Sequence, residues 1–523
     1  MSKQPGRSTA ENKSLLLGID VGTSGTKSVI VDASGNILGS GFKAYGHHSP
    51  QPGWVEQEPI WYVEGVRESA ARAVAESGRK WADVYGLSIT HQRLTFIPIN
   101  KNGQPVYPAI VWNDTRCSEE ARWASDAVGA ESIFRRTGYP PGIWSVYKVL
   151  WLKNHRPEIY HKAYQCHMVS DWLIFQLTGK TVTSCGTAAT SGALNLALKD
   201  KWDTDLLKAF GLREDIFVPD IRPSGTVVGS VTEEAEAVFK IPAGIPVVTA
   251  AGDQPCGSLG AGQFASGTLS ANGGTACTCE ALTTEIPALQ DPNYFVEISP
   301  TGAYIMENSI YSGASALINW YRDNFDRCQS EPEPNKWAYL QKSAAKTPVG
   351  NLGLIMVPFF GGAGAPYWNM EARGALLGLC EDHGGGNVLR AIIEGLAYEI
   401  KRESDLMAQD ASQPLKRLIT YGGSNSIWNQ TLADVFNLPL DAVLTEDTTA
   451  LGAAMCAAAG VGIYKDVTSA GQAMAPEATT FRPQEKTAAF YNSFYREVYE
   501  GLYDSIEKRL SRARKLALEF LED

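Results

Sequence analysis

Short runs of apolar and β-branched residues follow a polar beginning of the chain. Leu15–Ile19 is an apolar run of strand length, and Thr26–Asp32 continues in β-branched residues. Asn36–Gly39 restarts a strand after the turn signal at Asp32–Gly35. Glycine, asparagine and aspartate between such runs mark turns. The pattern therefore predicts three short strands joined by tight turns.

Strand-like and helix-like segments alternate further along the chain. Val84–Thr90, Phe96–Asn100 and Ile245–Ala250 have the composition of buried strands, whereas Tyr147–Gln176 is mainly helical in pattern. Such alternation is typical of an α/β protein.

A second glycine-rich hairpin is predicted in the middle of the chain. Gly267–Glu280 places a turn of small residues between two strands and echoes Gly18–Ser28. One such hairpin in each half indicates a duplicated fold with a nucleotide between the halves. Glycine-rich hairpins are common, so coincidence is an equal alternative.

The length of 523 residues exceeds one ordinary domain and predicts two large ones, with a third not excluded. We place the division near Gly252–Gln263, with a first domain over 15–252 and a second over 253–523. Apolar residues recurring every fourth position predict a long C-terminal helix over about 485–521. Residues 1–14 are polar and are expected to be disordered.

Composition excludes several classes of partner. The formal net charge of -11 gives no electrostatic case for binding nucleic acid or an anionic membrane. No apolar run of about 18 residues occurs and the N-terminus lacks an apolar leader, so neither a membrane span nor a signal peptide is expected. Nine cysteines without framework spacing indicate reduced thiols and a cytoplasmic protein. A homodimer is compatible with the sequence.

The first hairpin carries a candidate phosphate loop. Asp20 ends an apolar strand and is followed by the segment Gly22–Lys27, which is rich in glycine and hydroxyl groups and ends in a lysine. Glycines let a backbone approach phosphate, N–H groups and hydroxyls donate to its oxygens, and a lysine offsets its charge. An aspartate at the strand end can hold Mg²⁺ through water. The Walker A spacing is absent, and a plain hairpin turn is the alternative.

A second candidate carboxylate, Asp253, follows the strand at Ile245–Ala250. Its place beside Gly252 and near the domain boundary suits a base that takes a proton from a substrate hydroxyl. Phosphoryl transfer otherwise needs mainly positioning and charge stabilisation. Taken alone, the residue is better explained as a helix N-cap.

Two further glycine-rich loops, Gly361–Tyr367 and Gly422–Ser426, occur in the second half of the chain. The later one ends a strand and precedes a helical run at Trp428–Phe436, a turn that can lie flat against a nucleotide. Each by itself is better explained by a simple tight turn.

Taken together, these segments resemble the FGGY carbohydrate kinases, in order from about Leu15 to about Lys465. The matching segments are Gly18–Ser24, Pro52–Pro59 (PGWVEQEP), Ile110–Arg116 (IVWNDTR), Gly252–Asp253, Pro366–Gly374 and Ala450–Ala454 (ALGAA). Within the family the sequence is closest in appearance to the xylulose kinases, because Ile110–Arg116 is similar to their sugar-site segment.

The resemblance implies an α/β protein of two actin-like (ribonuclease H-like) ATPase domains, with the active site in the cleft between them. It implies ATP and Mg²⁺ as cofactors and a sugar or polyol as the partner. Asp253 would be the general base, and Asp20 would help hold Mg²⁺–ATP.

The resemblance also assigns binding residues. Those implied for the β- and γ-phosphates are Thr23, Ser24 and Lys27, joined by Gly274 and Thr275 of the second domain. Those implied for adenosine are Gly422, Gly423 and Asn425. Those implied for the sugar are Gln92, Arg93, Trp112, Asn113 and Asp114, together with Asp253.

The sequence departs from the family's patterns in ways that leave the acceptor open. Glycerol kinases have Arg-Glu where this chain has Arg93-Leu94, and Leu94 cannot bind a hydroxyl. Xylulose kinases have Met-His there. We therefore expect phosphate transfer to a pentulose such as xylulose, with glycerol, erythritol, ribulose and autoinducer-2 as alternatives.

A non-catalytic actin-like nucleotide switch is a second class of function. Both Asp20 and Asp253 are present, however, and so is a polar segment around Trp112 that a chaperone or filament protein would not need. A sugar-responsive repressor would need a DNA-binding helix-turn-helix, for which the residues before Leu15 are too few.

Overall fold

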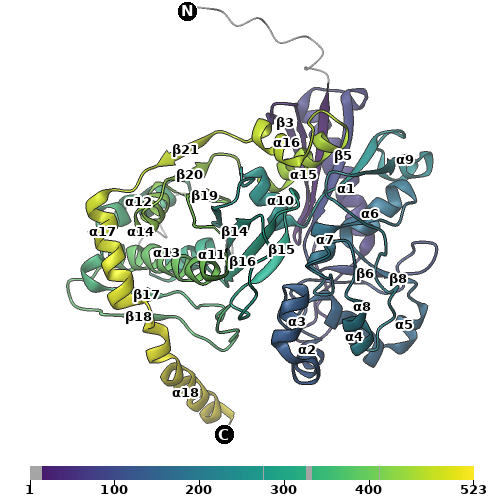
Figure 1. The fold of residues 1–523 in the computed structure, drawn as a ribbon. Helices are drawn as coiled ribbons and strands as arrows, with labels where there is room; N and C mark the ends of the chain where they lie inside the picture. Colours follow the sequence, from purple (N-terminus) through teal and green to yellow (C-terminus); the bar gives the residue numbers. More distant parts are fainter. Residues whose placement is uncertain (1–13, 275, 326–332, 412, 424, 523) are drawn as a thin grey trace, which may run out of the picture. The chain divides into compact units, whose positions relative to one another are not determined.

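The computed structural model describes residues 14–522, apart from 275, 326–332, 412 and 424 (Figure 1). The N-terminal segment for which we expected disorder thus lies, except for its last residue, outside the described part. The described residues form two compact units. The first unit contains the chain up to Phe264 with Thr284–Ile305 and Asp447–Pro476, and the second contains Ala265–Thr283, Met306–Glu446 and the chain from Glu477 on. This division differs from a single boundary after residue 252, because later segments return to the first unit.

The first unit is built on a six-stranded sheet of order β11-β12-β5-β1-β2-β3. Its strands are β1 (Leu15–Val21), β2 (Gly25–Val31), β3 (Ile37–Ala44), β5 (Val84–His91), β11 (Val227–Ser230) and β12 (Pro246–Thr249). The first three strands run antiparallel to their neighbours in a meander, as the turn signals predict. β1 and β12 both pair with β5 in parallel.

Helices cover both faces of this sheet. They are α1 (Pro59–Ser77), α6 (Val169–Thr178), α9 (Glu233–Phe239), α10 (Asp253–Gly260), α15 (Thr448–Gly460) and α16 (Val467–Met474). Along β1 the side chains alternate, as they must in a strand. Leu17 and Ile19 join the core beneath α1 and α6, whereas Leu16 joins the core beneath α10 and α15. The same alternation puts Asp20 on the α10–α15 side.

Small residues let α15 approach β1 and α10 at backbone distance. A Cβ atom on Gly18 would lie 1.9 Å from the carbonyl oxygen of Ala450, and one on Gly452 would lie 1.9 Å from that of Cys256. Figure 1 shows α15 and α16, from late in the chain, beside the purple strands of the first sheet. The Ala-Leu-Gly-Ala-Ala sequence of α15 is therefore a packing feature that seats the start of this helix near the end of β1.

The remaining elements of the first unit form a smaller lobe. Its sheets have the orders β4-β7-β6-β8 and β10-β9. The strands of these sheets are β4 (Glu56–Gln57), β6 (Phe96–Ile99), β7 (Ala109–Ile110), β8 (Gln165–Met168), β9 (Thr183–Ser184) and β10 (Ile221–Arg222). Strand β15 (Phe295–Ile298) lies in the returning segment and belongs to neither sheet. The helices are α2 (Ser118–Ala124), α3 (Ala130–Thr137), α4 (Ser145–His155), α5 (Pro157–Lys162), α7 (Cys185–Ala189) and α8 (Thr204–Ala209). The stretch Tyr147–Gln176 is thus not purely helical, because β8 pairs with β6 within it.

The second unit contains a sheet in which β16, β14, β13, β19, β20 and β21 follow one another. These strands are β13 (Thr268–Asn272), β14 (Cys277–Thr283), β16 (Tyr304–Ile310), β19 (Arg417–Tyr421), β20 (Leu440–Val443) and β21 (Ala478–Phe481). β13 and β14 pair as an antiparallel hairpin, and β13 runs parallel to β19. This repeats the β2-β1-β5 arrangement of the first unit, so the hairpin echo in the sequence reflects a repeated fold.

Helices and a small ribbon complete the second unit. They are α11 (Ala314–Phe325), α12 (Glu333–Lys346), α13 (Gly385–Asp410), α14 (Ser426–Phe436), α17 (Glu485–Phe494) and α18 (Leu502–Glu522), with β17 (Ile355–Val357) and β18 (Ala375–Leu377). The C-terminal helix predicted over about 485–521 is interrupted, because Gly501 adopts a left-handed φ of 74° between the last two helices. Across the ranges described above, no helix combines the length and apolar character needed to cross a membrane.

Candidate active site

The parallel strands β1, β5 and β12 end at one edge of the first sheet. Asp20 lies opposite Thr90 in the register of β1 and β5. Arg93 is the second residue after β5, and Asp253 begins α10 shortly after β12. The carboxyl ends of adjacent parallel strands are a common place for ligand sites in α/β sheets. The sheet therefore brings together three residues that the sequence predicted for the site.

The turn between β1 and β2 is held from several directions. Tyr45 Oη donates to the carbonyl oxygen of Gly22 at 2.7 Å, and Gln57 Nε2 donates to that of Thr23 at 2.8 Å. The indole Nε1 of Trp112 donates to Thr23 Oγ1 at 2.9 Å. The phosphate-loop candidate and the sugar-segment candidate are thus in direct contact.

Asp20 is a half-buried carboxylate in an acidic setting. Its Oδ1 atom is buried and has no hydrogen-bond partner among the described residues. Burial, and after it the carboxylates of Asp253 and Asp447, raise the pKa of Asp20 to about 8, against the opposing effect of Lys27. Lys27 Nζ lies 2.8 Å from Asp447 Oδ1, and Ser24 in the turn is exposed.

This setting suits a cation next to Asp20. An unpartnered carboxylate oxygen beside other carboxylates is stabilised by positive charge. Within the described ranges, no three histidine, cysteine or acidic side chains converge as a ready-made metal cage. That is compatible with Mg²⁺, which keeps several waters and usually takes one or two carboxylates plus substrate phosphates.

The side chain of Arg93 joins two carboxylates. Its Nε atom lies 3.1 Å from Asp253 Oδ1, and its Nη1 atom pairs with Glu297 Oε1. Tyr139 Oη donates to the same Glu297 oxygen at 2.5 Å. A glycine is required at position 252, where the backbone passes close to the Arg93 side chain, because a Cβ atom there would lie 2.3 Å from Arg93 Cγ.

The pKa of Asp253 is raised by burial and lowered in part by Arg93. Its side chain is nevertheless 30% exposed, so a substrate hydroxyl can reach it. Gln254 N–H donates to Asp253 Oδ1 at 2.9 Å. Asp253 is the first residue of α10 and not its N-cap, which is Gly252.

Gln92 lies below this surface. It is 1% exposed, its N–H donates to the carbonyl oxygen of Val21, and its Nε2 donates to Gln57 Oε1 at 2.7 Å. Gln57 thus links Gln92 to the turn at Thr23. These contacts favour a role for Gln92 in holding the loop that begins with Arg93.

Trp112 and Asn113 are exposed at the segment that follows β7. Lys148 is fully buried and donates to the carbonyl oxygens of Val111 and Trp112 at 2.7 and 2.8 Å. Burial lowers the pKa of Lys148 to about 8. The backbone under the indole is therefore anchored while its side chain faces outward.

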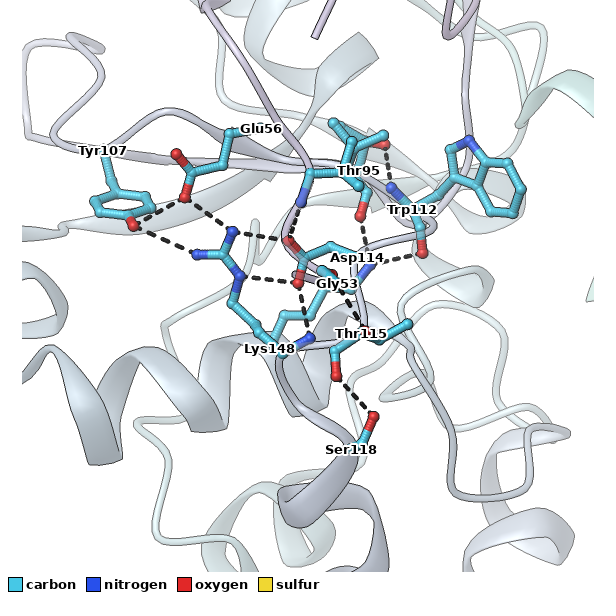
Figure 2. A network of polar contacts seen from close by, with 12 residues as sticks. Gly53, Glu56, Thr95, Tyr107, Trp112, Asp114, Thr115, Ser118 and Lys148 are labelled. Atoms are coloured by element: carbon cyan, nitrogen blue, oxygen red, sulfur yellow. Dashed lines mark hydrogen bonds and ion pairs between the residues drawn. The ribbon is translucent and has the colours of Figure 1, made fainter. Parts of the chain in front are cut away.

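Asp114 is engaged by its own neighbours, as Figure 2 shows. Its Oδ2 accepts from Val55 N–H at 2.6 Å and from Arg116 Nη2 at 2.7 Å, and its Oδ1 accepts from Arg116 Nε at 2.8 Å. Arg116 also reaches Glu56 Oε1 at 2.8 Å and lies over the ring of Trp54, 3.9 Å from its centroid. Asp114 is fully buried, so this geometry favours holding the loop over direct contact with a sugar.

In the second unit, the turn after β13 lies beside the end of β19. Gly273 N–H donates to the carbonyl oxygen of Tyr421 at 2.9 Å, and Gly274 N–H donates to Asn272 Oδ1 at 2.9 Å. Thr275 lies outside the described residues. The glycine turns predicted for phosphate and for adenosine are therefore neighbours within this unit.

The turn after β19 requires its glycines. Gly422 and Gly423 have φ values of 70° and 101°, which L side chains rarely adopt. Asn425 Oδ1 accepts from Ile427 N–H at 3.1 Å and Trp428 N–H at 3.0 Å, so this residue is the N-cap of α14. The cap occupies the side-chain oxygen that a contact with adenosine would otherwise use.

Sequence reasoning missed three residues of this surface: Asp447, Glu297 and Tyr139. Asp447 directly precedes α15, whose Ala-Leu-Gly-Ala-Ala stretch was recognised, so the helix start could have identified it. Glu297 comes from a segment that returns from the second half of the chain and has no local motif. Glu297 can be identified as part of this surface only from the folded structure, in which its buried carboxyl group contacts Arg93.

Comparison with protein families gives two matches that together cover most of the chain. The description of the first is the FGGY family of carbohydrate kinases, N-terminal domain, over residues 15–260. The second is the C-terminal domain of the same family, over residues 269–461.

Individual relatives carry two different names. Glycerol kinase 2 of Thermotoga maritima is 31% identical over 466 residues, covering 86% of this chain and 91% of the relative. Xylulose kinase of Lactococcus lactis subsp. lactis is 27% identical over 495 residues, covering 93% and 96%. A solved structure of ligand-bound xylulose kinase from Lactobacillus acidophilus superposes with a TM-score of 0.85 at 24% identity, covering 94% and 98%. The α/β fold with two actin-like domains, predicted from the sequence, is confirmed by this likeness.

Proposed function

This chain belongs to the FGGY family of carbohydrate kinases, phosphotransferases with an alcohol group as acceptor, and from this premise we propose the acceptor and the roles of its residues. The reaction is transfer of the γ-phosphate of ATP to a hydroxyl of a pentulose such as xylulose, or of a related polyol. Asp253 is the general base that takes the proton of this hydroxyl.

The single observation that carries the proposal is the setting of Asp253. Its carboxylate is partly exposed at the strand-end edge, oriented by Arg93 Nε at 3.1 Å, and its pKa is raised by burial. A base whose pKa lies nearer the working pH takes a proton more effectively than an ordinary aspartate. Asp253 lies close enough for its carboxylate to raise the pKa of Asp20, which suits two neighbouring groups that serve opposite ends of a phosphate transfer.

The residues assigned to bind the phosphates of ATP lie in the first hairpin, formed by β1 and β2. Thr23, Ser24 and Lys27 are assigned to the β- and γ-phosphates, with Lys27 offsetting negative charge as the phosphoryl group moves. Asp20 is assigned to hold Mg²⁺, which when bound neutralises charge on the phosphate oxygens. Contacts of Gly274 and Thr275 with phosphate, and of the turn at Gly422 with adenosine, stay predictions.

The residues assigned to bind the sugar are exposed side chains beside this hairpin. The anchored indole of Trp112 offers a flat apolar face for the C–H groups of a sugar, and Asn113 offers hydrogen bonds. Arg93 borders the reacting hydroxyl through its contact with Asp253.

Glycerol is the second candidate acceptor, because a glycerol kinase is among the relatives and Arg93 matches that family pattern. Leu94 weighs against it. This residue has a φ of 65°, its carbonyl oxygen accepts from Ser145 Oγ, and its side chain has no hydrogen-bonding group.

A coupled ADP-release assay across D-xylulose, L-xylulose, D-ribulose, glycerol, erythritol and the autoinducer-2 precursor tests the proposal, with and without Mg²⁺. We expect one pentulose, or one polyol longer than glycerol, to stimulate ADP release strongly, and only with Mg²⁺. Stimulation by glycerol alone would overturn the acceptor assignment, and ADP release that no acceptor stimulates would overturn the proposed transfer.

A further inference from the structure

Arg93 is the cation next to the proposed base, and its charge is already balanced. It contacts Asp253 through Nε and Glu297 through Nη1. The arginine side chain is 14% exposed and that of Glu297 is 0% exposed. Two carboxyl groups therefore share one guanidinium, which has no further charge to offer a third.

The other cations of this surface in the first unit are also engaged. Lys27 pairs with Asp447, and Lys148 is buried against the carbonyl oxygens of Val111 and Trp112. Arg116 pairs with Asp114 and with a second carboxylate. Around the proposed acceptor position, the described side chains of this unit thus offer no guanidinium or ammonium group that lacks a counter-charge or an acceptor.

Glu297 is placed for this balance by packing. It lies on β15, where Val296 N–H donates to the carbonyl oxygen of Gly138. Tyr139 and Phe295 stack at 5.2 Å between ring centroids and, with Trp144, form an apolar wall around the carboxylate. Burial raises the pKa of Glu297 above its usual value, and Arg93 and then Tyr139 offset this only in part.

We infer that Glu297 is a specificity-determining residue that, by sharing Arg93 with Asp253, restricts the acceptor to uncharged sugars and polyols and rejects acidic sugars such as aldonates. The inference rests on the proposed function, because it concerns the acceptor of the same site. A carboxylate on the acceptor would need a cation with charge to spare, since an ion brought out of water requires a partner. Here the neighbouring guanidinium of Arg93 is already shared by Asp253 and Glu297. Glu297 acts through Arg93 and is not assigned a contact with the acceptor.

Matched acceptor pairs test this directly. Erythritol and erythronate, or xylitol and xylonate, share a carbon skeleton and differ in a terminal alcohol or carboxylate. We expect the wild-type protein to bind the neutral member of each pair more tightly, measured by calorimetry, and to phosphorylate it with the higher kcat/KM. Equal or tighter binding of the aldonate by the wild-type protein would overturn the inference.

The variant Glu297→Gln keeps the shape of the side chain and removes its charge. Arg93 then has one counter-charge, so we expect the preference for the neutral member, as a ratio of Kd or kcat/KM values, to fall about tenfold, the size of one charge-assisted contact. Tyr139→Phe removes a hydrogen bond to Glu297 but no charge, and should keep the preference. Glu120→Gln is the matched control, because it changes another buried carboxylate, which lies on α2 and pairs with His155 instead of Arg93, and it should also keep the preference.

The outcomes separate this inference from the proposed function. A neutral preference that Glu297→Gln leaves unchanged contradicts the role of Glu297, whether or not the protein is active. If no acceptor stimulates ADP release by the wild-type protein, the proposed function is contradicted. Calorimetry then still measures whether the protein binds the neutral or the acidic member of each pair more tightly. If Glu297→Gln does not fold, Glu297→Ala removes the same charge, and an unchanged neutral preference in that variant likewise contradicts the inference.

Discussion

The Nζ atom of Lys27 lies 2.8 Å from Oδ1 of Asp447, although the lysine belongs to the first hairpin and the aspartate precedes a helix late in the chain. The pair forms because glycines let α15 sit at backbone distance from β1 and α10. Both partners remain partly exposed, at 34% and 21%, so the ion pair itself adds little stability. The ion pair instead positions the ammonium group of Lys27 beside the turn that is assigned to bind phosphate.

Replacing Lys27 by methionine tests this position. We expect Lys27→Met to lower kcat by about a hundredfold, as the loss of one charge-stabilising group does in other enzymes. Lys43→Met is a matched control, because Lys43 has similar exposure but its ammonium pairs with Glu68 of α1, which covers the other face of the sheet from α15. Steady-state kinetics that show equal losses in the two variants would contradict the role of Lys27.

The close packing of β1 on α15 makes a second prediction. In Gly18→Ala the new methyl group would lie 1.9 Å from the carbonyl oxygen of Ala450, so helix or strand must shift. We expect a loss of about 1–3 kcal/mol in the free energy of unfolding, as for other overpacked sites, together with weaker activity. Gly46→Ala, where nothing lies within 4 Å, should change neither in denaturation experiments.

Neighbouring residues of the sugar segment should behave differently. Asp114→Asn removes a buried charge from Arg116, so we expect a lower melting temperature and a cost of about 3 kcal/mol, the scale for breaking a buried ion pair. Asn113→Ala changes an exposed side chain and should raise the KM for the acceptor without lowering the melting temperature. The reverse pattern would show that Asp114, and not Asn113, meets the acceptor.

The raised pKa of Asp20 predicts how stability depends on pH. Between about pH 4 and 8 the folded protein holds a proton on Asp20 that the unfolded chain releases, because the pKa rises from 3.8 to about 8 on folding. Stability of the ligand-free protein from this group must therefore fall as pH rises through that range. In Asp20→Asn the melting temperature should fall less between pH 5 and 8 than in the wild-type protein. An unchanged dependence on pH would rule out the buried, acidic setting of Asp20.

Much of the site could be predicted because its residues follow strands with clear patterns. Asp20, Arg93 and Asp253 stand at the ends of β1, β5 and β12, and parallel pairing of these strands was the remaining information needed to bring them together. Asp114 and Asn425 show the limit of motif matching. Both have the expected residue type, but the structure engages one in a buried ion pair and the other as a helix cap.

Glu297 shows why the rest could not be predicted. Nothing in its local sequence indicates a site, and its role depends on a segment that returns to the first unit from the other half of the chain. The place where this segment packs is fixed by tertiary contacts, such as the hydrogen bond from β15 to Gly138. The pattern of residues along the sequence does not indicate such contacts.

Asp253→Asn tests the central claim most directly, because it keeps the shape of the side chain and removes the proposed base. In the wild-type protein the best acceptor should stimulate ADP release, and the variant should lose this stimulation by at least about a thousandfold, within the usual range for loss of a general base. Its affinity for ATP, measured by calorimetry, should stay close to the wild-type value. Retained turnover in Asp253→Asn would remove Asp253 from the role of base and contradict the account.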